Sequence, residues 1–142
     1  MTQKSAAQVQ AEHEAIMRDV HARAQAFTDK RQETSMRRAH EVARLVLHLR
    51  HAQEPVSRRR MLALGLSSDW FYSLALAMLR TAGLEAAPVG TIEELGAALA
   101  SLDATHERLQ AASTAGFEEL RSHATKRQER RRYVHAGGRE SN

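Results

Sequence analysis

The chain has 142 residues and no cysteine, and its net charge is +4 at pH 7 with histidine neutral. Without cysteine it can form neither a disulfide framework nor a thiolate metal site. Hydrophobic residues make up 42% of the chain but aromatic residues only 4%, a balance that favours helices packed through Ala, Leu, Val and Met. No apolar run reaches membrane-spanning length, and the start of the chain lacks the apolar segment of a secretory signal. We therefore expect a cytoplasmic protein that makes no membrane contact.

Residues 1–35 predict an amphipathic helix followed by a polar segment. Four apolar residues recur there at near-heptad spacing: Val9, Ile16, Val20 and Phe27. Such a narrow stripe is typical of a coiled-coil seam rather than of a helix that packs broadly on a core. The polar run 28–35 either forms a hinge or continues the helix, and the sequence pattern fits both.

Residues 36–84 predict a unit of three helices. The first carries apolar residues at the spacing of one buried helix face: Val42, Leu45, Val46 and Leu49. Pro55 ends this helix, because a proline keeps the residue before it out of the helical conformation. Ser57 is the expected cap of a short second helix, and Ser67 or Ser68 that of the third. Gly65 and Gly83 supply the left-handed positions at which helices end.

The order of residues around the first of these glycines resembles that of helix-turn-helix DNA-binding proteins. Leu64-Gly65-Leu66-Ser67 gives an apolar residue, the turn glycine, a second apolar residue and a small polar cap. Apolar residues then follow at the spacing of that family's inner helix face: Phe71, Leu74 and Met78. The resemblance is to wingless proteins of bacterial or phage type, and it implies binding of double-stranded DNA.

The resemblance assigns two sets of contacts. Arg58, Arg59 and Arg60 would hold phosphates. The residues facing the groove would be Ser67, Ser68, Asp69, Tyr72 and Ser73. A different interpretation stays open, because the third helix is apolar nearly all round, as is typical of a buried strut. The arginines would then form a solvated face.

Residues 91–125 predict a helical oligomerisation segment. Thr91 and Glu94 have the spacing of a capping box, which opens the helix. Its apolar stripe alternates between spacings of four and three: Leu95, Leu99, Leu102, His106 and Leu109. This seam predicts packing against the N-terminal helix or against a second copy of the chain.

Residues 126–142 form a basic tail. Its cations are Lys126, Arg127, Arg130, Arg131 and Arg132. They would bind nucleic acid without sequence preference, RNA included, or would suit the negative end of a helix dipole.

We find no phosphate-binding loop, dinucleotide fingerprint or nucleophile motif, and the histidines lack metal-ligand spacing, so neither an enzyme nor a cofactor nor a metal is expected. The predicted fold is all-α, with a central helix-turn-helix unit flanked by long amphipathic, coiled-coil-like helices. The predicted function is that of a homo-oligomeric DNA-binding protein with a regulatory or DNA-packaging role. The alternative is a helical interaction protein, an adaptor or self-assembling subunit that binds no nucleic acid.

Overall fold

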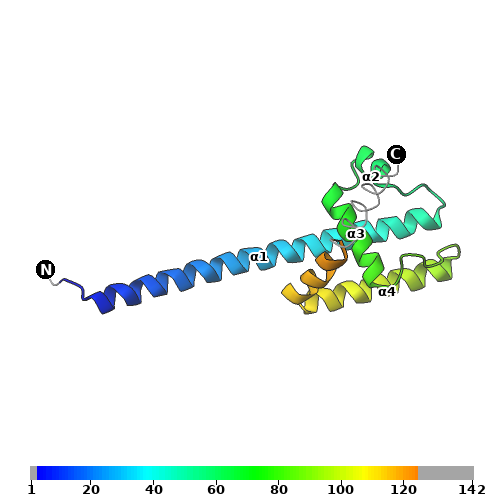
Figure 1. Cartoon of the computed structure of the whole chain (residues 1–142). Helices are drawn as coiled ribbons and strands as arrows, with labels where there is room; N and C mark the ends of the chain where they lie inside the picture. Colours follow the sequence, from blue (N-terminus) through cyan, green and yellow to red (C-terminus); the bar gives the residue numbers. More distant parts are fainter. Residues whose placement is uncertain (1–2, 125–142) are drawn as a thin grey trace, which may run out of the picture.

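A single helix of 46 residues, α1 (Ala6–His51), runs through the whole molecule (Figure 1). The computed structural model describes residues 3–124. Ser5 caps α1 in a capping box with Gln8, each side chain bonding the backbone N–H of the other residue. The polar run 28–35 is helical throughout, so it continues the helix and forms no hinge.

The remaining helices gather around the C-terminal part of α1 (Figure 1). They are α2 (Arg58–Ala63), α3 (Asp69–Thr81), α4 (Ile92–Ala111) and a further helix over residues 114–124. No strand occurs in the described residues, so the fold is all-α as predicted. We call this group, residues 36–124, the head, and the exposed part of α1, residues 6–31, the rod; residues 32–35 of α1 join the two.

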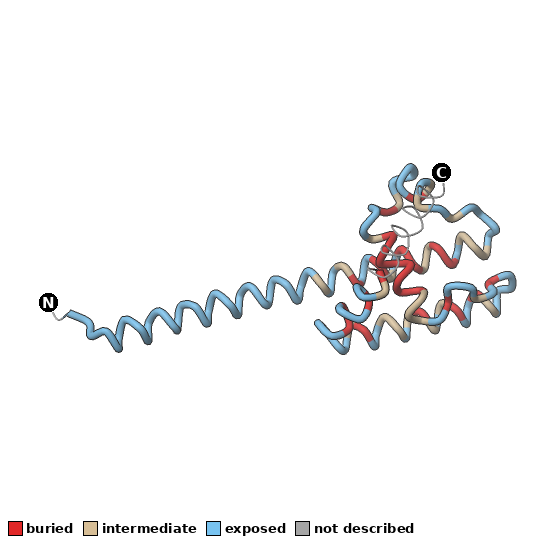
Figure 2. The backbone as a smooth tube through the Cα atoms, in the orientation of Figure 1, coloured by how far each residue is buried: buried red, intermediate tan, exposed pale blue. Residues whose placement is uncertain are grey.

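The core lies entirely within the head. Figure 2 shows buried residues only at that end of the molecule, whereas the residues of the rod are exposed along its whole length. α1 contributes one face of small and aliphatic side chains to this core: Met36, Ala39, Val42, Ala43, Val46 and Leu47. α3 lies across them, packed against α1, α2 and α4.

The two predicted glycine turns are present. Gly65 (φ 67°) and Gly83 (φ 72°) both adopt the left-handed conformation that ends a helix. After Gly65 the Leu66 N–H bonds the Met61 carbonyl at 3.0 Å, which closes the end of α2. Ser68 then caps α3 by accepting from the Phe71 N–H at 3.3 Å. The corner between α2 and α3 is therefore set by local residue chemistry.

α4 begins at the predicted Thr91–Glu94 capping box and ends at Ala111. Its apolar stripe packs against other helices of the same chain, because Leu95, Leu102 and Leu109 are buried in the core of the head. Leu99 packs against that core from a half-buried position. The seam is thus accounted for within one chain and requires no second copy.

The chain reverses after α4, and the helix over residues 114–124 packs back against it. The reversal includes Ser113, whose φ of 54° is left-handed. Gly116 faces α4 so closely that an added Cβ would lie 2.0 Å from the Leu109 carbonyl oxygen. Only a residue without a side chain permits this approach.

None of the helices in residues 3–124 combines the length and the apolar character that crossing a bilayer requires.

Candidate functional site

The helix expected to read DNA is the central strut of the head. Tyr72 is only 5% exposed and Ser73 only 2%, and every residue from 72 to 79 is buried. Side chains in such positions cannot reach base edges in a groove. Tyr72 and Ser73 therefore lie inside the head, enclosed by the neighbouring helices, and not on the outer surface where the predicted DNA contacts would place them.

The serines before α3 have structural roles. Ser68 is occupied as the cap of α3. Ser67 is buried, and its hydroxyl donates to the Ser68 carbonyl at 2.9 Å. Ser67 thus faces inward at the turn after Gly65, and not outward as the predicted groove contact would require.

Two of the three predicted phosphate-binding arginines have partners within the chain. Arg58 pairs with Asp69, and its Nη2 donates to the Ser73 hydroxyl at 3.1 Å. Its guanidinium also lies over the Tyr72 ring, 5.6 Å from the centroid. Arg60 pairs with Glu54 at 3.4 Å.

Arg59 is exposed and makes no hydrogen bond or ion pair with the described residues. The predicted tail contacts lie outside residues 3–124: Lys126, Arg127, Arg130, Arg131 and Arg132. Within the described part of the chain, the α2–α3 corner therefore presents one arginine without a partner rather than a cluster of three.

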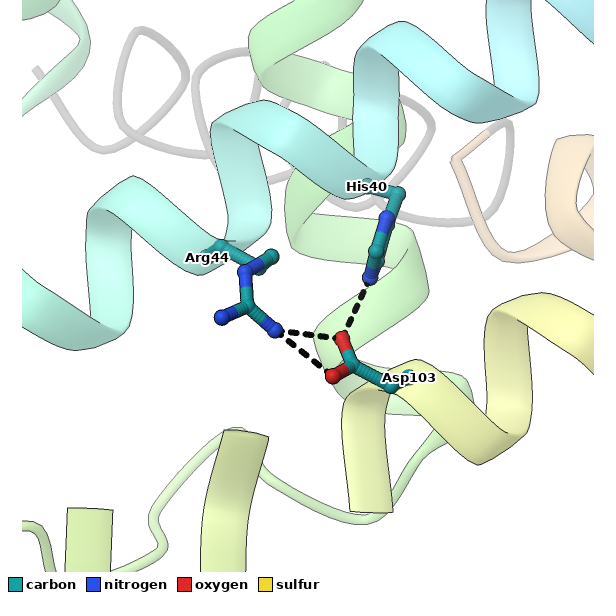
Figure 3. Close-up of polar contacts among 3 residues, drawn as sticks. All are labelled: His40, Arg44 and Asp103. Carbon is teal, nitrogen blue, oxygen red and sulfur yellow. Dashed lines mark hydrogen bonds and ion pairs between the residues drawn. The ribbon is translucent and has the colours of Figure 1, made fainter. Parts of the chain in front are cut away.

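A polar cluster joins α1 to α4 on another side of the head (Figure 3). Asp103 accepts hydrogen bonds from Arg44 Nη1 at 2.6 and 2.7 Å, and it bonds His40 Nε2 at 2.6 Å. Burial raises the pKa of the Asp103 carboxyl, but the bonds and charges of Arg44 and His40 outweigh burial and hold that pKa below its ordinary value.

The His106 ring stacks on the His40 ring, with centroids 4.1 Å apart. Its Nε2 is buried without a hydrogen-bond partner. Burial lowers the pKa of His106, and the nearby His40 charge lowers it further. His106 was expected in an oligomer seam, but here it packs between α1 and α4 of one chain. Among the described residues, no group of three or more histidines or carboxylates is arranged to hold a metal ion.

The rod carries a row of exposed apolar side chains. Four apolar side chains lie on one side of it and face solvent: Val9 is 53% exposed, Ile16 61%, Val20 49% and Phe27 64%. At 3.6 residues per turn they all fall on the same narrow face of α1. We call this face the rod seam.

The rod seam runs directly into a groove at the base of the head. The groove has a volume of about 510 Å³ and is lined by Phe27, Lys30, Arg31, Thr34, Ser35, Trp70 and Phe71. Phe27 and Thr34 continue the heptad spacing of the seam, while Trp70 and Phe71 from the start of α3 form the wall. Trp70 is 42% exposed there. Neither Lys30 nor Arg31 has an acidic partner among the described residues.

The heptad spacing pointed to the rod seam, but sequence patterns did not reveal the groove. Its wall comes from residues some 40 positions further along the chain, and nothing in the local pattern of Trp70 and Phe71 places them beside Phe27. We compared the chain with protein-family models, curated proteins and solved structures, and none of the three comparisons found a match.

Proposed function

We propose that this chain is a helical assembly protein. Its rod associates with the rod of a second copy, and the head is the folded unit that each rod holds in the assembly. The observation that carries this proposal is the exposed rod seam. In the head the apolar stripes of α1 and α4 are largely buried, whereas Val9, Ile16, Val20 and Phe27 are 49–64% exposed. Apolar residues at heptad spacing on a long helix are the pattern by which helices pair.

The physics of helices in water supports this assignment. Isolated helices are marginal because nucleation is costly, and most helices in proteins are stabilised by packing of an apolar face. The contacts along the rod itself are weak ones. They are exposed pairs such as Lys4–Glu12 at 2.9 Å and Arg23–Asp19 at 3.2 Å, each contributing a few tenths of a kcal/mol. Burial of a seam residue against another helix contributes about 1.5–3 kcal/mol, which is several times more.

The structure of the head also supports association through the rod. Its α3 is enclosed, Arg58 and Arg60 have acidic partners, and the leucine stripe of α4 is filled within the chain. The head also exposes single apolar side chains such as Leu64 and Ile92, but those of the rod seam share one helix face and continue into the groove.

Sedimentation velocity of two double variants tests the proposal. Ile16→Glu with Val20→Glu puts charge into the rod seam, and we expect it to convert a dimer into a monomer. Ala11→Glu with Ala22→Glu adds the same charge to the opposite face of the rod, where both alanines are exposed. This control should sediment as the unmodified chain. A monomeric unmodified chain at high protein concentration would remove the basis of the proposal.

Binding of double-stranded DNA is the second candidate. The corner formed by Ser57, Gly65 and Ser68 has the caps and turn of the helix-turn-helix pattern, and Arg59 beside it has no partner among residues 3–124. Titration of fluorescent random-sequence DNA against salt tests it, because phosphate contacts weaken steeply as salt rises. We expect no binding that depends on Arg59. Salt-dependent binding that Arg59→Ala weakens would favour DNA binding instead.

A further inference from the structure

We propose that the second copy runs antiparallel along the rod, so that the first turn of each rod lies in the groove at the base of the other copy's head. In this arrangement Val9 of one copy faces Phe27 of the other, and Ile16 faces Val20. The inference rests on the proposed self-association and adds its direction, its register and the role of the groove.

The charges in the rod seam favour this direction. The seam's two heptad positions hold His13, Val20 and Phe27 in one series and Val9, Ile16, Arg23 and Lys30 in the other. A parallel pair in register stacks each residue on its own copy, so Lys30, which has no acidic partner among the described residues, meets Lys30, and Arg23 meets Arg23 with each paired to Asp19 of its own helix. Like charges in one layer are destabilising.

Antiparallel pairing removes both clashes. When Val9 faces Phe27, Arg23 lies level with His13 and next to Glu12 of the second copy, and Lys30 lies level with Ala6. Ile16 and Val20 form the central layers, where apolar side chains from both copies interdigitate. Asp19 of each copy comes near the centre, where its carboxylate is already paired with Arg23 of its own helix at 3.2 Å.

The length of the helix fits the groove. α1 begins at Ala6 with Ser5 as its cap. In the proposed register Ala6 lies level with Lys30 and Ser5 with Arg31, both of which line the groove. The second helix therefore ends where the wall of Trp70 and Phe71 begins. A parallel partner would continue past this point as its own α1 and would bring a second head to the same place.

The first turn of the rod also suits the groove chemically. It presents small and aliphatic side chains to Phe27, Trp70 and Phe71, since Ala6, Ala7 and Val9 occupy that end. Lys4, the cation among the described residues of that end, is ion-paired with Glu12 at 2.9 Å, so it brings little net charge to Lys30 and Arg31. The exposed Trp70 and Phe27 rings would lose much of their contact with water in the pair.

Engineered disulfides test direction and register, because the natural chain has no cysteine to interfere. Val9→Cys and Phe27→Cys are purified separately, mixed, and oxidised. We expect a crosslinked dimer in the mixture and none in either variant alone, since equal positions in an antiparallel pair lie about 27 Å apart along the axis. A disulfide requires Cα atoms within about 7 Å.

Crosslinking of either variant with itself would overturn the antiparallel direction. A dimeric mass with no crosslink in the mixture would overturn the register. A monomeric mass for the unmodified chain would instead end the proposed self-association, so the two failures are distinguishable.

Trp70 gives a second readout, because it is the only tryptophan. A nitroxide is attached at Ala6→Cys in a chain that also carries Trp70→Phe, and this chain is mixed with unmodified protein. We expect quenching of Trp70 emission, because the label of one copy lies in the groove of the other. The same label at Ala22→Cys, on the opposite face of the rod, should leave the emission unchanged. Equal quenching by both labels, or by neither, would contradict the placement.

Discussion

Arg44 of α1 donates from a single nitrogen to both carboxylate oxygens of Asp103 on α4, at 2.6 and 2.7 Å. Together with His40 it makes Asp103 a polar link between α1 and α4 (Figure 3), next to the stacked rings of His40 and His106. The link is only partly shielded, since the Asp103 side chain is well exposed, so its contribution is smaller than that of a fully buried ion pair.

We expect Asp103→Asn to lower the free energy of unfolding by about 1 kcal/mol, because two charge-assisted bonds are weakened at a partly hydrated site. The lowered pKa of Asp103 means that this stability is present above about pH 4 and is lost as the pH falls through the folded-state pKa. Urea unfolding at neutral pH measures the effect. Glu119→Gln is the control, since Glu119 accepts a single bond from Arg108 at 3.0 Å, whereas Asp103 is bonded by two side chains, so the change at Glu119 should matter less. Equal losses in the two variants would show that the Asp103 link has no special role.

We expect the free energy of unfolding to fall at mildly acidic pH because of His106. Its pKa is lowered in the folded state, so the unfolded chain takes up this proton first as the pH drops below about 6.5. Stability therefore falls below that pH and levels off once the folded chain is protonated as well. We expect His106→Phe, which keeps a ring beside His40, to lose less stability than the natural chain between pH 7.5 and 5.5. His21→Asn, on the exposed rod, should behave as the natural chain does. A variant whose loss matches that of the natural chain would remove His106 as the cause.

The two glycines of the C-terminal helices predict opposite outcomes. Gly116→Ala places a methyl group against the Leu109 carbonyl, so we expect the head to lose about 1–3 kcal/mol as the helices move apart. Gly96→Ala meets nothing within 4 Å and lies inside α4, so it should gain about 0.5–1 kcal/mol from helix propensity. Thermal unfolding of both variants checks the pair. A neutral Gly116→Ala would mean that residues 114–124 do not pack against α4 as described.

Arg58 and Arg59 of α2 should differ in their effect on stability, because only Arg58 contacts other residues of the head. Arg58→Ala removes the contacts to Asp69, Ser73 and Tyr72, and we expect a loss of about 1–2 kcal/mol in the free energy of unfolding. Arg59→Ala removes no contact within the described residues and should leave stability within about 0.5 kcal/mol. Denaturant unfolding distinguishes the two variants. A destabilising Arg59→Ala would contradict the exposed position of that side chain.

Features set by neighbouring residues could be predicted from the sequence. The caps at Ser57 and Thr91 and the left-handed glycines at positions 65 and 83 all depend on a few consecutive residues, and the structure confirms them. The all-α class followed from composition and from helical spacing of the apolar residues.

Features that depend on distant residues could not be predicted. The apolar surface of α3 fitted either a recognition helix or a buried strut, and only the packing of α1 and α4 around it decides for the strut. Asp103 lies 59 residues from Arg44, and no local pattern brings them together. The apolar spacing of α4 is the same for a helix that packs within its own chain and for one that packs against a second chain, so the sequence pattern could not distinguish the two.

The most direct measurement of the central claim is hydrogen exchange of the rod backbone as a function of protein concentration. If a second copy covers the rod seam, amides of residues 9–27 are protected at high concentration and lose protection on dilution. Amides of the head should change little, because its core is complete within one chain. Protection of the rod that is the same at every concentration, or absent at all of them, would contradict the account.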